Sequence, residues 1–235
     1  KVDVDTHDRL TRWAIDHLAT TADRSLPAML EVALERRYSA SPGEGFFTGG
    51  GRHTFGNFNA SDNAREPTLR EALQASINLP FVRLMREIVR YTMYQVPGST
   101  AQLLEDAEDP RRAEYLARFA DREGQTFVRR FWRKYEGRSA EEMRSLLLDG
   151  LRPSAEQRQA VYRWLFRTRS RSAQDSRIFT MLEVEAFLDI HRRWARLGYP
   201  FGHLVPSLAT ALGSSGDRPA ALAELMGIIV NDGLR

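Results

Sequence analysis

The sequence predicts a mainly α-helical protein, and two kinds of observation support that prediction. Apolar residues recur close to the helical period of 3.6 residues in several stretches. Where new stretches begin, Ser or Thr often stands three residues ahead of Glu or Gln, the pattern of a helix capping box. The exception is residues 38–66, which are rich in Gly, Ser, Asn and Pro. We therefore expect helices nearly throughout, interrupted by one long loop.

Two helices are expected before that loop. Residues 8–19 repeat apolar side chains near the helical period, and Pro27 suits the first turn of a helix over 27–37. The loop has Gly49-Gly50-Gly51 at its centre, and we expect a short strand around 53–58. Loops of this length inside a domain are usually functional or disordered.

A sharp helix start follows the loop. Thr68 stands three residues ahead of Glu71, which forms a capping box and opens a short helix. Asn78-Leu79-Pro80 interrupts this helix, and Pro80 then suits the first turn of a longer one. An apolar stripe on one side of the longer helix runs to about Tyr94, and Pro97-Gly98 closes the block.

The second half of the chain changes in texture. Residues 99–175 are charged and rich in Arg, and capping-box patterns at 139–142 and 154–157 indicate at least two new helices. Residues 167–177 are polar and predict a loop, whereas 178–197 predict a strongly amphipathic helix that Gly198 ends. Two shorter helices are expected over 206–212 and 219–230, the second capped by Asp217 and followed by the turn Asn231-Asp232-Gly233.

This pattern divides the chain into three parts. Residues 1–98 form a first helical segment, and residues 99–175 are interpreted as a helical insertion. Residues 176–235 form a last helical segment, which the family resemblance described below makes the return segment of the first. At 235 residues the chain is long enough to bury a core.

Composition narrows the function classes. The hydrophobic fraction of 42% is that of an ordinary globular protein, and no apolar run approaches the roughly 20 residues that span a bilayer. The net charge is only +3, yet nearly all cations are arginines, because Lys1 and Lys134 are the only lysines. Arginine grips phosphates well, so nucleic-acid binding has to be considered, although the codon bias of a GC-rich genome explains the arginines more simply. We therefore expect no nucleic-acid partner.

Several kinds of chemistry find no support in the sequence. There is no cysteine, which rules out disulfides and thiolate chemistry. The five histidines lack metal-ligand spacing, and the glycines at 49–51 lack the Lys-Ser/Thr that would complete a phosphate-binding loop. The basic and aromatic cluster at 129–135 is typical of nucleic-acid or membrane-surface helices, but a solvated helix with inward aromatics accounts for it as well. We expect neither a metal nor a cofactor.

The triplet Ser76-Ile77-Asn78 is the strongest candidate site. It lies on the short connection between the two helices that follow the loop. There a serine hydroxyl and an asparagine amide can project into a groove instead of being bound to a helix backbone. We take Ser76 and Asn78 as the candidate catalytic residues.

In its setting the triplet resembles the second active-site motif of class A penicillin-binding proteins. Residues 67–84 match the family's short capped helix, its Ser-x-Asn and the long helix that follows. A second resemblance covers the segments 206–213 and 218–225 and then Asn231-Asp232-Gly233, which look like the stretch ahead of the family's third motif. The resemblance implies a helical portion of a transpeptidase domain with a β-lactamase-like fold.

The resemblance also implies a chemistry, which is acyl transfer through a serine ester. Ser76 would pass a proton toward the leaving D-alanine nitrogen, and Asn78 would hydrogen-bond a carbonyl of the peptidoglycan stem peptide. Stem peptides and β-lactams would be the ligands of the complete protein. That parent would lie on the periplasmic side of the inner membrane, held by its own anchor and accompanied by a glycosyltransferase domain.

The sequence departs from the family at its lysines. Neither Lys1 nor Lys134 has a serine three positions before it, and neither is followed by Ser-Gly or Thr-Gly. The Ser-x-x-Lys and Lys-Thr-Gly motifs are thus both missing, and a serine without a neighbouring base is a poor nucleophile. We therefore expect an internal fragment of the transpeptidase domain that is inactive alone, contacts other domains of its parent, and has one motif upstream and the other downstream.

Three other interpretations stay open. Ser76-Ile77-Asn78 can be a mere turn between two helices. The chain can be a non-catalytic helical scaffold that binds cell-wall partners. It can also be an arginine-rich helical protein that binds nucleic acid, which is the weakest of the three.

Overall fold

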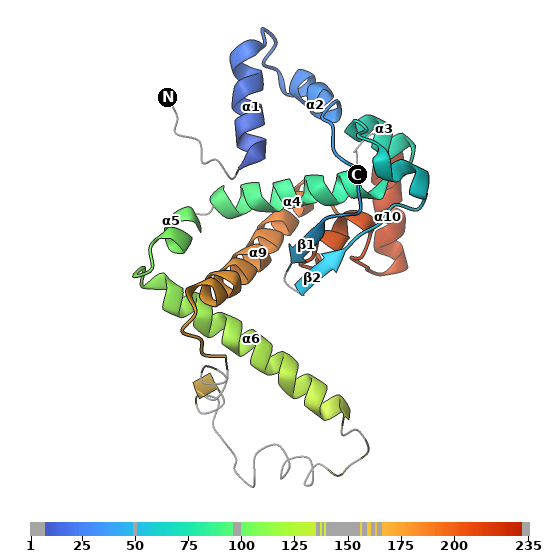
Figure 1. The fold of residues 1–235 in the computed structure, drawn as a ribbon. Coiled ribbons are helices and arrows are strands. Elements are labelled where there is room, and N and C mark those ends of the chain that lie inside the picture. The colour runs from blue at the N-terminus through green and yellow to red at the C-terminus, as the bar shows by residue number, and fades with distance from the viewer. Residues whose placement is uncertain are drawn as a thin grey trace. The chain divides into compact units, whose positions relative to one another are not determined.

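The computed structural model describes residues 8–48, 51–95, 100–134, 137, 139, 156, 159, 160, 163 and 166–231. Several features named above lie wholly or partly outside them: Lys1, Gly49-Gly50, Pro97-Gly98, the capping-box segments 139–142 and 154–157, the cluster 129–135, and Asp232-Gly233. Over its described part the chain is mainly helical, with eight α-helices and one small two-stranded sheet (Figure 1). The predicted helical class is confirmed. Membership of a transpeptidase domain stays a prediction.

The chain forms two compact units. The first consists of Lys1–Ser99 and Leu182–Arg235, and the second of Thr100–Met181. The long helix α9 (Arg171–Arg196) contributes its beginning to the second unit and the rest to the first. Each unit is described by itself.

The N-terminal half of the first unit holds most of its elements. α1 (Arg9–Thr20) is capped by the Asp8 carboxylate, and α2 (Leu26–Leu34) is capped by Ser25. The antiparallel strands β1 (Gly45–Thr48) and β2 (Gly51–Thr54) pair with Gly45 opposite Thr54. A 3₁₀ turn η1 (Ala60–Ala64), α3 (Leu69–Gln74) and α4 (Asn78–Gln95) follow.

The core of the first unit lies along α4. Leu79, Val82, Met85, Val89 and Met93 on this helix are almost wholly buried. The helix packs against α1, α3 and the 3₁₀ turn η2 (Leu208–Leu212), whose Leu208 is also buried. Burying each such side chain contributes about 1.5–3 kcal/mol, so α4 is the element that holds the first unit together.

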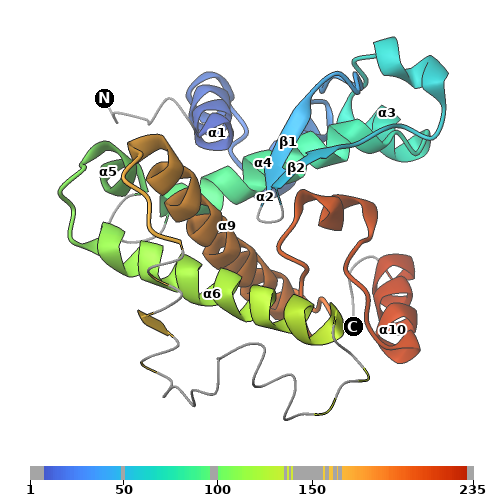
Figure 2. The same ribbon diagram turned by 60° about the horizontal axis from the view of Figure 1, so that its bottom comes forward.

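The C-terminal part of the unit ends in α10 (Pro219–Val230), which has the predicted bounds. The prediction that Asp217 caps it is wrong. Asp217 instead accepts hydrogen bonds from the backbone N–H groups of Gly202 and Arg218, because its carboxylate is turned toward the preceding loop. Of the α10 side chains only Ala221 is buried. Figure 2 shows α10 after the irregular segment that connects it to α9.

The second unit is built from α5 (Thr100–Glu105), α6 (Arg111–Lys134) and the beginning of α9. Arginines connect these helices. The buried Arg112 donates to the Leu103 carbonyl at 2.9 Å and to the Asp175 carboxylate at 2.6 Å. Arg171 donates to the carbonyl of Glu105 at 2.7 Å, so the open carbonyls at the end of α5 are satisfied by a side chain.

Two local predictions are corrected by the structure. Residues 171–177 are helical and not a loop, because Asp175 pairs with Arg112 and polar contacts replace the missing apolar stripe. The strand expected around 53–58 ends at Thr54, and its partner over 45–48 was not predicted. Four residues on each strand are too few to show a clear alternation in the sequence.

Candidate functional site at the α3–α4 link

The α3–α4 link, residues 75–77 between the two helices, is where the structure places the candidate motif. The helix that leads into it is firmly started. Thr68 Oγ1 accepts from the N–H of Glu71 at 3.1 Å, and Glu71 Oε2 accepts from the N–H of Thr68 at 2.8 Å. Both hydrogen bonds of the predicted capping box are therefore present.

The segment before α3 is braced along its length. Backbone N–H groups of Tyr38 and Ala40 donate to the carbonyls of Pro67 and Arg65, and Leu69 N–H donates to Arg36. These bonds lay residues 36–40 beside residues 65–69. The entry into α3 is thus fixed by backbone hydrogen bonds, independently of side-chain charge.

Ser76 ends α3 in an unusual conformation. Its φ is 52°, and no other non-glycine residue among those described has a positive φ. Its N–H donates to the Leu73 carbonyl at 3.3 Å, and Ile77 N–H donates to Ala72 at 2.9 Å. This pair of bonds is the Schellman motif, in which glycine normally occupies the left-handed position. A serine there costs roughly 1–2 kcal/mol of backbone strain.

Ile77 anchors the link in the core. It is 0% exposed and lies in a cluster with Ala40, Ala72 and Phe81. A buried apolar residue after the left-handed position is the usual companion of a Schellman motif. Because Ile77 cannot leave this cluster cheaply, its two neighbours along the chain are held at fixed places. Ser76 itself is exposed.

Asn78 starts α4 and is held by the loop. Its side-chain Nδ2 donates to the Gly56 carbonyl at 3.0 Å, and the residue is half-buried. Its side-chain oxygen accepts no hydrogen bond from another described residue. Asn78 therefore keeps a free acceptor on a side chain whose direction is set by the loop.

Asn57 is a site residue that sequence reasoning missed. Its Oδ1 accepts from the N–H of Leu79 at 3.1 Å, so it satisfies one of the open donors in the first turn of α4. Its Nδ2 donates to the Ala40 carbonyl at 2.7 Å and to Asn63 at 2.9 Å. The only hint of this role in the sequence is that the loop is rich in Asn. Asn57 and Leu79 are 22 positions apart, so no local sequence pattern indicates that they bond.

The geometry allows a limited chemistry. The two candidate residues lie two positions apart on one link, Ser76 with an exposed hydroxyl and Asn78 with a free amide oxygen. Together they can donate to and accept from a peptide or pass a proton. No described base hydrogen-bonds the Ser76 hydroxyl, so the hydroxyl is not activated as a nucleophile within the described residues.

Other kinds of site find little support in the described residues. They contain no group of three His, Cys, Asp or Glu side chains that could hold a metal ion. None of their helices is both long and apolar enough to cross a bilayer.

Comparisons with known proteins leave the family open. No protein-family model, no curated protein and no solved structure matches the chain.

Proposed function

We propose that the chain is a helical part of a penicillin-binding protein, where it supplies one wall of the stem-peptide groove of a D,D-transpeptidase. The parent would cross-link peptidoglycan on the periplasmic side of the membrane. The observation that carries this proposal is the left-handed conformation of Ser76, the first residue of the Ser-x-Asn motif.

The strain at Ser76 has a physical meaning. Glycine would complete the Schellman motif without the steric cost that serine incurs. Strained non-glycine residues cluster at functional sites, where the side chain matters more than the lost stability. A hydroxyl placed on an exposed link, beside a fully buried Ile77, is what a proton relay needs, since its position is set by the fold.

Asn78 supports the same proposal. One N–H of its amide donates to the Gly56 carbonyl, which orients the group and leaves the second N–H and the oxygen free. The second N–H can donate to a carbonyl of the stem peptide, as the resemblance implies. The oxygen can accept from an N–H of an extended peptide.

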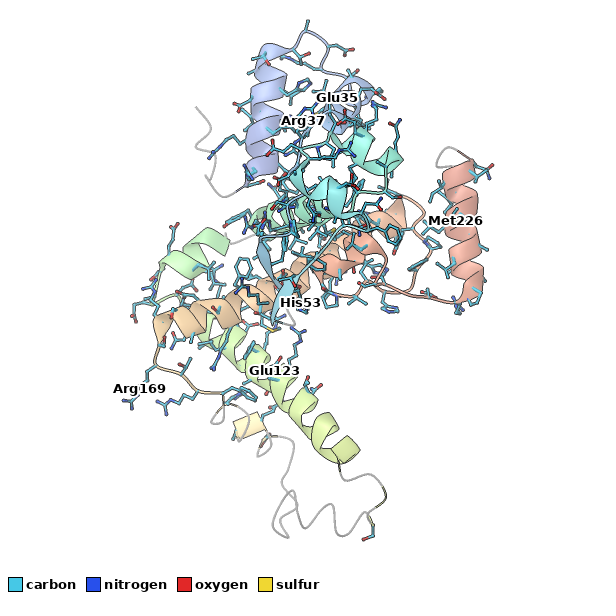
Figure 3. All side chains as sticks on the ribbon, turned by 45° about the vertical axis from the view of Figure 1, so that its right-hand side comes forward. Glu35, Arg37, His53, Glu123, Arg169 and Met226 are labelled. Atoms are coloured by element: carbon cyan, nitrogen blue, oxygen red, sulfur yellow. The ribbon has the colours of Figure 1, made fainter. Side chains whose placement is uncertain are left out.

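Exposed apolar helix faces support contact with further protein. On α2, Leu26 and Leu30 are 68% and 56% exposed, and on α10 Met226 and Ile229 are 57% and 60% exposed. Figure 3 labels Met226 on α10. Contiguous apolar surface of this kind usually marks an interaction site. In the proposed parent, these faces would be covered by other parts of the transpeptidase domain.

The missing lysines limit what the chain does alone. The nucleophile and its lysine, and the third motif, would come from other segments of the parent protein. We expect that a fluorescent penicillin labels the full gene product and leaves this 235-residue chain unlabelled. In the full product, Ser76→Ala should slow labelling by about 10²-fold or more, the size of a lost proton transfer.

Ser214→Ala is the matched control, because Ser214 is also an exposed serine of the first unit. It should label at the normal rate. The proposal fails if the isolated chain is labelled, if the full product is not, or if Ser76→Ala behaves like Ser214→Ala.

A second candidate function is a non-catalytic scaffold that binds cell-wall partners. The exposed apolar faces of α2 and α10 favour it, since they need a partner whether or not catalysis occurs. The two candidates separate in the same experiment. A scaffold requires that Ser76→Ala and Asn78→Ala leave penicillin labelling of the full product unchanged.

A further inference from the structure

A cavity in the first unit lies away from the Ser-x-Asn motif. Its volume is about 920 Å³, large enough for a small molecule, and neither Ser76 nor Asn78 lines it. Its walls come from α1, from residues 36–44 and from α4. Figure 3 shows Arg37, one of its lining residues, on the segment that follows α2.

Helical spacing explains why α1 and α4 each present charged side chains to this cavity. On α1 the lining residues recur three and four positions apart from Arg9 to Thr20, and include Arg12, Trp13 and His17. On α4 the lining residues are Arg83, Arg86 and Glu87, again three and four apart. Residues at this spacing share one side of a helix, so each helix turns a single charged face to the cavity.

The cavity has more cations than anions. Its described lining holds six arginines, Arg9, Arg12, Arg36, Arg37, Arg83 and Arg86, against three carboxylates, Asp16, Glu44 and Glu87. Two of these carboxylates are already shared. Glu87 accepts from Arg36 at 2.6 Å and from the Tyr38 hydroxyl at 2.8 Å, and Glu44 pairs with both Arg83 and Arg86.

Some of these arginines stabilise the fold. We call residues 36–44 together with Arg83 and Arg86 the arginine wall. Arg83 donates to the carbonyls of Ser39 and Ser41 at 2.6 and 2.8 Å, which fixes the segment against α4. The guanidinium of Arg36 lies 4.9 Å from the ring centre of Trp13 and 5.2 Å from that of Tyr38. The wall is therefore preorganised.

Two arginines at the rim of the cavity, Arg9 and Arg12, are less engaged. Arg12 is exposed, and its side chain has no ion pair or hydrogen bond to another described residue. The Arg9 side chain is 70% exposed, and its Nη1 lies 3.8 Å from Glu87, a carboxylate already engaged by Arg36. In the same lining, the Nε2 atom of His17 is buried without a hydrogen-bond partner in the described part of the chain.

Further positive charges lie behind the wall. Burial lowers the pKa of Arg90 most, the charges of Arg86 and Arg9 lower it further, and Tyr94 and Glu44 oppose them. Burial likewise lowers the pKa of Arg83, where Glu44 opposes and Arg86 adds to the effect. Guanidinium groups that disfavour one another in this way are stabilised when an anion arrives.

We propose that this cavity binds a small molecule with at least two oxyanion groups, carboxylate or phosphate. Arg9 and Arg12 hold the anionic groups at the rim, where guanidinium donors can bind them bidentately. The half-buried Trp13 offers the adjoining apolar surface, and His17 offers an unused nitrogen. The proposal does not depend on the transpeptidase assignment, since it uses none of the motif residues.

Isothermal titration calorimetry on the 235-residue chain at low salt tests this site, with pyrophosphate and citrate as separate probes. We expect at least one probe to bind with a Kd below about 1 mM. Binding of pyrophosphate alone identifies a phosphate ligand, and binding of citrate alone identifies a carboxylate ligand. Failure of both probes to bind at several times that concentration overturns the proposal.

The rim is tested by the double substitution Arg9→Gln with Arg12→Gln, which should weaken binding by about tenfold or more. Arg192→Gln with Arg193→Gln is the matched control, because it removes two exposed arginines from another helix of the same unit. The control should bind within about twofold of the wild type. Equal losses in the two double variants would show non-specific attraction to a basic protein and would contradict the proposed site. Circular dichroism melts confirm that both variants are folded.

Discussion

The α3–α4 link and the arginine wall both hold side chains in fixed positions, but different interactions stabilise them. The link fixes Ser76 and Asn78, and the wall fixes Arg36, Arg83 and Arg86. The link is held by backbone hydrogen bonds and by the buried Ile77, and it contains no ion pair. The wall is held by Arg36, Arg83 and Arg86, which bond to carbonyls and to two carboxylates.

This difference teaches where each region is vulnerable. Backbone bonds and apolar burial respond little to salt or pH, whereas partly exposed ion pairs are screened by salt and lost in acid. We therefore expect the link to respond mainly to changes of shape and the wall mainly to changes of charge. Substitutions in the two regions test this difference in vulnerability, from the largest expected effect to the smallest.

The largest effect is expected from Ile77→Ala in the link. Removing a side chain that is 0% exposed leaves a cavity and should lower the free energy of unfolding by about 2–5 kcal/mol. Urea denaturation followed by circular dichroism measures the change. The control is Leu73→Ala on α3, where the side chain is 68% exposed and the change should stay within about 0.5 kcal/mol. Similar losses in both variants would mean that Ile77 is not the anchor.

A smaller effect of opposite sign is expected from Ser76→Gly. Glycine removes roughly 1–2 kcal/mol of strain at φ 52°, and its greater freedom in the unfolded chain takes back about 0.4–1 kcal/mol. The net result is a gain of up to about 1.6 kcal/mol in the free energy of unfolding. In the full gene product the same variant should label slowly with penicillin, so stability and activity would move in opposite directions.

Ala75→Gly is the control for that prediction. Ala75 has a φ of −97°, where glycine relieves no strain and only loosens the unfolded chain. It should therefore destabilise the protein. A Ser76→Gly variant that is no more stable than Ala75→Gly would remove the argument for strain at the motif.

The smallest effect concerns acid and the wall. Burial alone would raise the pKa of Glu44, but the hydrogen bond and charge of Arg86, and then Arg83, lower it below its ordinary 4.5. A carboxyl with a lowered pKa in the folded protein stabilises the fold above pH 4.5, and that contribution is lost as the pH falls below it. Between pH 6 and pH 3, the stability of Glu44→Gln should therefore decline less than that of the wild type.

Urea denaturation at several pH values measures this difference. The effect is small because the Glu44 side chain is 39% exposed. Raising the salt concentration to about 1 M at pH 6 should bring the two proteins closer together, since it screens the same pairs. Parallel pH profiles for the two proteins would show that Glu44 does not stabilise the wall.

The sequence predicts the local features of the α3–α4 link well. The capping box at Thr68, a break between two helices and Pro80 in the first turn of the second all depend on residues within a few positions of one another, and all are present. The break was predicted at Asn78-Leu79-Pro80 but lies at residues 75–77, because α4 already begins at Asn78. Ser76 and Asn78 could be chosen because the motif is continuous in the chain. The left-handed φ of Ser76 was not predicted, because Gly is the residue that normally signals that conformation.

The features that the sequence could not predict depend on distant partners. Asn57 reaches Leu79 across 22 positions, and Arg83 reaches Ser39 across 44. The start of α9 was predicted as a loop because its sequence is polar. It is helical and its Asp175 pairs with Arg112, which lies 63 positions away. The common reason is that a polar side chain in a sequence gives no sign of which distant backbone group or carboxylate it will meet.

The clamp of Arg83 on residues 39 and 41 also bears on the order in which the molecule assembles. The hydrogen bonds that end α3 close loops of three to five residues, so the α3–α4 link can form as soon as its helix does. The clamp closes a loop of more than forty residues and needs α4 already in place. We therefore expect the motif to form early in folding. The arginine-lined cavity should be completed late, when Arg83 on α4 meets residues 39 and 41, which lie more than forty positions earlier in the chain.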